Sequence, residues 1–122
     1  MSSWTADELR ALDRIDEIRV AGRRNDGSVR TLTIVWHVVV DGKVYVRSVR
    51  GTEGSWYKGV VRHYEGAISW DGRTRDVTYV PDDTVDDQLD AAYLAKYGDG
   101  PDTVAIINAT ARPTTLRVEP RS

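Results

Sequence analysis

The stretch TLTIVWHVVV at residues 31–40 is the strongest strand signal in the sequence. Side chains alternate between the two faces of a strand, and both faces of this run are largely apolar. That pattern is typical of a strand that is covered on both sides. The dipeptide Asp41-Gly42 follows at once, and Asp-Gly is a strong signal for a two-residue hairpin. We therefore expect a second strand at residues 43–49, paired with the first.

Shorter segments on either side carry their own signals. Thr5 is a good N-cap, and Glu8 completes a capping-box pattern, which predicts a helix at the start of the chain. Ser55 and Thr84 are the expected caps of a short and a longer helix, and Gly98 is the expected end of the longer one. The remaining segments are expected to form strands at residues 17–21, 67–70, 73–80 and 114–118, with a tight turn at 71–72 and a further helical turn at 104–107.

These elements define a fold class. About six strands, two tight hairpins and two or three helices in one small chain predict an α+β protein. The strands follow one another too closely for βαβ units. A small closed or split antiparallel barrel with peripheral helices satisfies the pattern.

Length and composition exclude several classes of protein. The chain of 122 residues is expected to form one domain, residues 1–122. It contains no cysteine, which excludes disulfides, thiol catalysis and zinc–thiolate or iron–sulfur sites. No apolar run approaches the ~20 residues of a membrane span, and the chain opens with no signal-peptide pattern. We therefore expect a cytoplasmic protein that does not bind a membrane.

Charge is distributed unevenly along the chain, although the net charge is only −2. Residues 18–60 hold eight Lys or Arg against three Asp or Glu, a balance of +5, and residues 76–102 hold eight Asp against one Lys, a balance of −7. Two solvated faces account for this pattern, and so does an anion-binding site in the basic half. Nucleic-acid binding by the basic half is a third interpretation, against which the acidic segment counts.

Neither the aspartates nor the histidines form a convincing catalytic or metal motif. The aspartate run at residues 82–90 lacks the glycine and the terminal glutamate of a calcium loop, so we expect a solvated helix there and no bound metal. The two histidines, His37 and His63, have no neighbouring nucleophile motif, and His37 lies within an apolar strand.

The segment YVRSVRGTEGSWYK at residues 45–58 is the most informative for function. A strand ends in serine and arginine, enters a loop that contains glycine, and meets the start of a helix. Such a place suits a phosphate, because arginine donates charge-assisted hydrogen bonds and glycine lets the backbone approach closely. A simple turn at the end of a strand explains the same residues.

A resemblance to known proteins adds to this interpretation. The order of hairpin, YVRSVRG, loop, SWYKGVVR, ISW, Asp-Gly and RDVTYV resembles the small split-barrel proteins related to deazaflavin-dependent nitroreductases. Nearly the whole chain is similar to a bacterial domain-of-unknown-function family, number 2255, which shares the opening WTADEL and the segment R-S-V-x-G…W-Y-K/R. The resemblance implies a six-stranded antiparallel split β-barrel of the FMN-binding kind, with the cofactor in a cleft between two subunits of a homodimer.

The resemblance also implies site residues. Arg50 occupies the position of the phosphate-binding Lys or Arg, and Ser48 and Gly51 match its small neighbours. Trp56 and Tyr57 match the aromatic pair that opens the helix. Arg47 is expected to add a second positive charge on the side that faces the cleft.

The first hypothesis is an oxidoreductase that binds FMN or a deazaflavin coenzyme through its phosphate and needs no metal. The catalytic residues are unknown, with His37, Tyr45 and Tyr57 as candidate proton donors. The alternative is a non-enzymatic binding module that retains the barrel and has lost the cofactor. Whether Arg47 and Arg50 converge on one pocket beside a flat apolar wall distinguishes the two.

Overall fold

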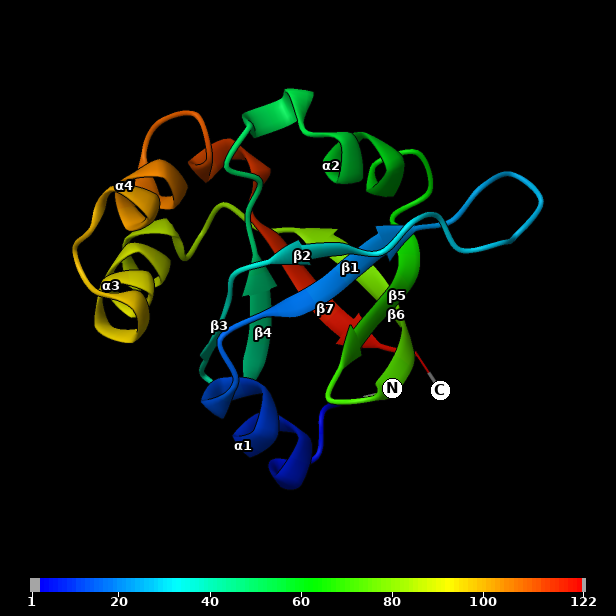
Figure 1. Cartoon of the computed structure of the whole chain (residues 1–122), viewed down its shortest axis with the longest axis horizontal. Coiled ribbons are helices and arrows are strands. Elements are labelled where there is room, and N and C mark those ends of the chain that lie inside the picture. The colour runs from blue at the N-terminus through cyan, green and yellow to red at the C-terminus, as the bar shows by residue number, and fades with distance from the viewer. Residues whose placement is uncertain (1–2, 122) are drawn as a thin grey trace.

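A computed structural model describes residues 3–121 (Figure 1). The chain forms four α-helices, two short 3-10 helices and seven strands within those residues. In chain order they are α1 (Ala6–Arg14), β1 (Ile18–Gly22), β2 (Thr33–Val35), β3 (His37–Val40), β4 (Lys43–Val46), η1 (Gly51–Glu53), α2 (Ser55–Val60), β5 (Glu65–Trp70), β6 (Arg73–Pro81), α3 (Asp86–Tyr97), α4 (Pro101–Ile107), η2 (Arg112–Thr114) and β7 (Leu116–Pro120).

The strands form one antiparallel sheet in the order β2-β1-β5-β6-β7-β4-β3. The two edge strands, β2 and β3, are consecutive in the chain and are separated only by Trp36. The sheet therefore curls until its edges meet, which makes a nearly closed barrel. The predicted α+β class and antiparallel split barrel are confirmed.

The strand count differs from the expected six because the run at residues 31–40 is not one strand. Its first part pairs with β1, with Val35 opposite Ile18, and its second part pairs with β4, with His37 opposite Val46. The partners lie at opposite ends of the sheet, so the chain turns a corner at Trp36 to reach both. The apolar pattern predicted the strand but not the corner.

Local signals placed most helices correctly. Thr5 and Glu8 form the predicted capping box of α1, and Gly98 ends α3 with a φ of 85°. The predicted caps Ser55 and Thr84 are wrong, because Gly54 and Val85 are the N-caps of α2 and α3. The Thr84 hydroxyl instead donates to Asp82 at 2.6 Å, which closes a turn before the helix.

Two apolar clusters fill the molecule. The barrel interior holds Trp4, Leu12, Ile18, Val20, Val35, Val44, Val46, Val60, Ile68, Trp70, Val77, Tyr79, Leu116 and Val118. A second cluster lies where β3 and β4 pack on α3 and α4, and it contains Val38, Tyr45, Leu89, Tyr93 and Ile106. In Figure 1, α3 and α4 lie together at the left of the barrel, α1 lies below it and α2 above it. The predicted two-sided cover of residues 31–40 holds for β3, whereas Ile34 of β2 is 52% exposed.

Two glycines let the backbone of β1 lie close to its neighbours: Gly66 of β5 packs against β1, and Gly22 of β1 packs against α2. A Cβ on Gly66 would lie 1.8 Å from the Ala21 carbonyl oxygen, and a Cβ on Gly22 would lie 2.5 Å from the Gly59 carbonyl oxygen in α2. Both clashes involve backbone, which no side-chain rotation relieves. Small residues at these points therefore fix the distance between β5, β1 and α2.

We predict that Gly66→Ala lowers the free energy of unfolding by at least about 2 kcal/mol, because overpacking forces the β1–β5 pair apart. Gly100→Ala is the control, since a Cβ there has no neighbour within 4 Å. Urea denaturation monitored by tryptophan fluorescence measures both variants. Equal stability of the two proteins would contradict the close-packing interpretation.

Candidate functional site

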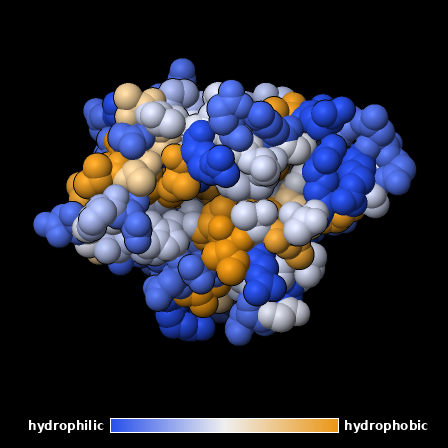
Figure 2. Space-filling model, turned by 45° about the horizontal axis from the view of Figure 1, so that its top comes forward, coloured by the Kyte–Doolittle hydropathy of each residue, from blue (hydrophilic) through white to orange (hydrophobic). Residues whose placement is uncertain are grey.

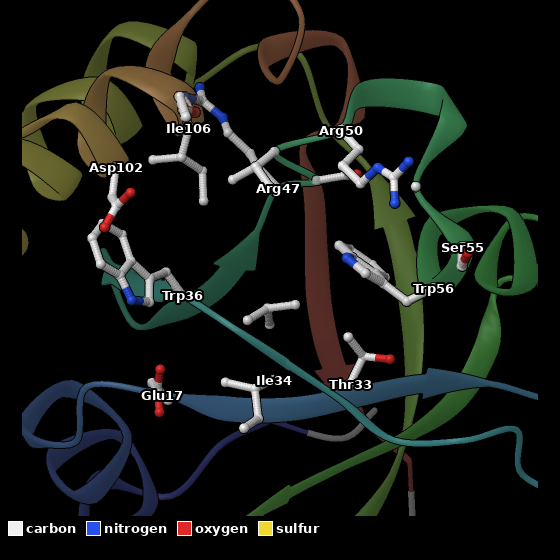
Figure 3. A pocket seen from close by; sticks show the side chains of 15 residues that line it. Glu17, Thr33, Ile34, Trp36, Arg47, Arg50, Ser55, Trp56, Asp102 and Ile106 are labelled. Atoms are coloured by element: carbon white, nitrogen blue, oxygen red, sulfur yellow. Dashed lines mark hydrogen bonds between the residues drawn. The ribbon is translucent and has the colours of Figure 1, made fainter.

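A cavity of about 460 Å³ opens between β2, the loop after β4, the start of α2, and α4 (Figure 3). Its walls combine apolar and aromatic side chains with four charged side chains, those of Glu17, Arg47, Arg50 and Asp102. The lining residues are Glu17, Thr33, Ile34, Val35, Trp36, Arg47, Ser48, Val49, Arg50, Gly54, Ser55, Trp56, Asp102, Ala105 and Ile106.

Four of the six predicted cofactor-binding residues line this cavity: Arg47, Ser48, Arg50 and Trp56. Gly51 and Tyr57 lie outside its lining. Gly51 adopts a φ of 66° and packs against Thr110, so that a Cβ would lie 2.7 Å from the Thr110 methyl group. Tyr57 packs against the barrel core and meets Trp56 edge to face, with ring centroids 6.0 Å apart. Both residues shape the loop and helix that carry the lining residues.

The loop that carries Arg50 is held by backbone contacts. The Ser48 N–H donates to Thr114 Oγ1 at 2.8 Å, and the Ser48 carbonyl accepts from the Gly51 N–H at 3.0 Å. Gly54 leaves room for the Ser48 hydroxyl, since a Cβ at Gly54 would lie 2.4 Å from that oxygen. Ser48 is buried and therefore fixes the turn from which Arg50 projects.

Arg50 is exposed and has no ion pair or side-chain hydrogen bond within residues 3–121. Figure 3 shows its guanidinium near Trp56 at one side of the cavity. The helix beside it, α2, starts without a side-chain cap. Arg50 is thus a cation at the cavity that retains its full hydrogen-bonding capacity.

Arg47 differs from Arg50 in its surroundings. Its side chain is fully buried, and its guanidinium donates to Asp90 at 2.6 Å and to Asp86 at 3.1 Å. It also donates to the Thr115 hydroxyl at 2.9 Å and the Ile106 carbonyl at 3.1 Å. The expected second positive charge at the cleft is therefore neutralised by two carboxylates. Through these contacts Arg47 connects the end of β4 to α3, to α4 and to Thr115, the residue before β7.

Trp36, at the corner between β2 and β3, forms part of the cavity wall opposite Trp56. Its indole stacks on Tyr97 of α3 with ring centroids 3.9 Å apart and an interplanar angle of 4°. The Tyr97 hydroxyl lies 2.7 Å from the Asp16 carbonyl and 2.9 Å from the His37 carbonyl. These contacts fix the indole plane.

Sequence reasoning assigned no site role to Trp36, Glu17, Ile34, Asp102 and Ile106. They come from three separate segments of the chain, which meet only in the folded protein. The apolar pattern of residues 31–40 marked Trp36 and Ile34 as strand residues, and no local signal marked the two carboxylates.

None of the three candidate proton donors lines the cavity. His37 is buried, and its Nε2 lies 2.5 Å from the Leu12 carbonyl oxygen and 3.3 Å from Nζ of Lys96. Burial, assisted by the Lys96 charge, lowers the pKa of His37 to about 4. Burial raises the pKa of Tyr45 and of Tyr57. His37 is therefore a neutral core residue at pH 7.

The aspartate run pairs with arginines. Asp86 and Asp90 bind Arg47, Asp87 binds Arg112 at 2.7 Å, and Asp82 binds Arg117 at 2.8 Å. The described part of the chain, residues 3–121, contains no group of three or more His, Asp or Glu side chains arranged to hold a metal ion. Over the same residues, no helix has the length and apolar character needed to cross a membrane.

Comparison with known families now adds to this geometry. A family model described as an uncharacterized protein conserved in bacteria, DUF2255, matches residues 8–118. The chain belongs to this family. No curated protein sequence matches this DUF2255 chain.

Solved structures similar to this DUF2255 protein share its fold. A conserved hypothetical protein from Mycobacterium tuberculosis has a TM-score of 0.62 and 13% identity, over 97% of this chain and 80% of the other. An F420 reductase has a TM-score of 0.55 and 18% identity, over 93% and 92% of the two chains. A FAD-binding protein from Mesorhizobium loti has a TM-score of 0.54 and 16% identity, over 96% and 88%. At these identities the likeness establishes the fold alone.

The burial of His37 predicts a pH dependence of stability. In the unfolded chain a histidine takes up a proton as pH falls through about 6.5, whereas folded His37 resists protonation until about pH 4. The free energy of unfolding should therefore fall as pH is lowered from 6.5 to 4, by up to about 3 kcal/mol from this group. Urea denaturation at several pH values measures the slope.

Two variants isolate this contribution. His37→Gln should flatten the slope between pH 6.5 and 4. Gln88→Ala should leave it unchanged, because Gln88 is exposed on α3 and carries no titratable group. Identical slopes in wild type and His37→Gln would show that His37 does not titrate differently in the folded chain.

Proposed function

We propose that this cavity binds flavin mononucleotide or a deazaflavin coenzyme through its phosphate, and that the protein is a nitroreductase-like oxidoreductase. The observation that carries the proposal is Arg50, an exposed cation without a carboxylate partner within residues 3–121, at a cavity walled by Trp36 and Trp56. Anion-binding arginines need free N–H groups, and planar rings need flat apolar walls. The shared fold of an F420 reductase and a FAD-binding protein supports the same assignment.

The residues present fit such a group. The cavity volume of about 460 Å³ lies in the usual range for small-molecule sites, and most of its exposed lining surface is apolar. Arg50 would hold the phosphate, and the indoles of Trp36 and Trp56 would flank a ring. A bound flavin or deazaflavin supplies the hydride chemistry itself. Ile34, Val49 and Ile106 would keep water away from the ring.

We predict that Arg50→Ala weakens binding of flavin mononucleotide roughly ten- to hundredfold, the loss of one charge-assisted hydrogen-bonding group. Arg50→Lys should retain part of the affinity, because lysine keeps the charge without the bidentate fork. The three proteins are titrated with flavin mononucleotide and with a deazaflavin coenzyme at two salt concentrations.

Arg73→Ala serves as the matched control, because Arg73 is also exposed but lies in the β5–β6 hairpin outside the cavity. Riboflavin, which lacks the phosphate, should bind wild type and Arg50→Ala equally. Equal affinity of all variants for flavin mononucleotide would remove Arg50 from the site. Failure of wild type to bind either cofactor would favour the alternative, a non-enzymatic module.

We further propose that two copies of the chain pack over the mouth of this cavity. Two large apolar side chains that line the cavity are about half exposed: Ile34 at 52% and Val49 at 51%. Figure 2 shows hydrophobic surface gathered in the middle of the visible face, with hydrophilic residues around it. Such an exposed patch suits a twofold contact between identical chains, which would also shield a bound cofactor from water.

Light scattering should therefore give twice the 13.7 kDa chain mass at micromolar concentration. The pair Ile34→Lys and Val49→Lys, combined in one protein, should shift the mass toward the monomer. Leu94→Lys is the control, since Leu94 is 40% exposed on α3 and does not line the cavity. A monomeric mass for wild type across the concentration range would contradict the dimer.

A further inference from the structure

The charges that line the cavity are separated between its two sides. Figure 3 shows Arg50 at one side with Trp56, and Glu17, Asp102 and Trp36 at the other. Glu17 and Asp102 are exposed, and neither forms an ion pair or a hydrogen bond through its side chain within residues 3–121. Elsewhere in that part of the chain, eleven ion-pair contacts join carboxylates to basic groups. The carboxylates that face this cavity are therefore left without a cation of the protein's own.

Trp36 supplies an aromatic surface between these carboxylates. Tyr97 covers one face of the indole at 3.9 Å and holds it in a fixed plane. Trp36 is half-buried and lines the cavity, so the other face is the one available to a ligand. Among aromatic side chains, tryptophan attracts a cation to its ring face most strongly, and neighbouring carboxylates increase that attraction.

The buried cation that lines the cavity does not oppose such a ligand. Arg47 also lines the cavity, but its guanidinium is neutralised by Asp86 and Asp90. Arg50 lies across the cavity, where an anionic group would bind. The two sides of the cavity thus favour ligands of opposite charge.

We propose that the Trp36 side of the cavity binds an organic cation, a substituted ammonium group that lies against the indole between Glu17 and Asp102. This proposal rests on the proposed function in one respect: the organic cation would be the substrate, while Arg50 holds the phosphate of the cofactor. The binding itself requires no cofactor and is tested without one.

The probe is choline, compared with dimethylbutanol, its uncharged carbon isostere. The four tryptophans give four indole N–H signals in nitrogen-15 NMR spectra, and the signal lost in Trp36→Phe identifies Trp36. We expect choline to shift the Trp36 signal in a saturable way, and dimethylbutanol to shift it much less at the same concentration. The double variant Glu17→Gln, Asp102→Asn should weaken choline binding roughly tenfold, because both carboxylates lose their charge while the shape is kept.

Asp41→Asn is the matched control, since it also removes an exposed carboxylate but lies in the β3–β4 turn outside the cavity. It should leave choline affinity unchanged. Equal shifts by choline and dimethylbutanol, or equal choline affinity in wild type and the double variant, would overturn the proposal. Choline binding by a protein that binds no flavin would leave this inference standing and remove the proposed function. Flavin binding without choline binding would overturn this inference and leave the proposed function standing.

Discussion

The whole barrel depends on one constraint: a single apolar run of ten residues pairs with both ends of the sheet. Residues 33–35 pair with β1 and residues 37–40 pair with β4, with Trp36 as the corner between them. Since β1 and β4 are far apart in the strand order, this double pairing brings the two edges together. The barrel stays nearly closed and not fully closed, since within residues 3–121 β2 pairs only with β1 and β3 only with β4.

The same corner creates the cavity. A strand that continued straight past Trp36 would keep its side chains in the regular alternation of a sheet. Instead the indole stacks on Tyr97, and α3 is tied to the corner through the Tyr97 hydroxyl and Lys96, whose Nζ donates to the His37 carbonyl at 3.2 Å. The closure of the barrel and the aromatic wall of the cavity therefore have one physical origin.

The second organising contact is the buried guanidinium of Arg47. It joins β4 to α3 through two carboxylates and also reaches α4 and the residue before β7. The fold tolerates this buried cation because two carboxylates neutralise its charge. The hydrogen bond from Arg47 to the Ile106 carbonyl also holds α4 in the position where its residues line the cavity. Aspartates of the acidic segment hold Arg47, Arg112 and Arg117 in ion pairs. Arg50 lines the cavity and forms no ion pair within residues 3–121.

The sequence by itself determined the local elements and much of the loop at residues 45–58. Each of these local signals acts over a few residues, so it can be recognised in the sequence without knowledge of the fold. They are the capping box of Thr5 and Glu8, the two Asp-Gly turns and the apolar run at 31–40. The resemblance of residues 45–58 to cofactor-binding split barrels pointed to Arg50 as a cofactor-binding residue; the structure places Arg50 at the cavity, and its binding of a cofactor stays a prediction. Only the tertiary structure decided that Arg47 is a core ion-pair residue and that His37 is a buried neutral group. Only the tertiary structure brought Trp36, Glu17 and Asp102 together, because contacts between residues so far apart in the chain depend on how the sheet closes and where α3 and α4 pack.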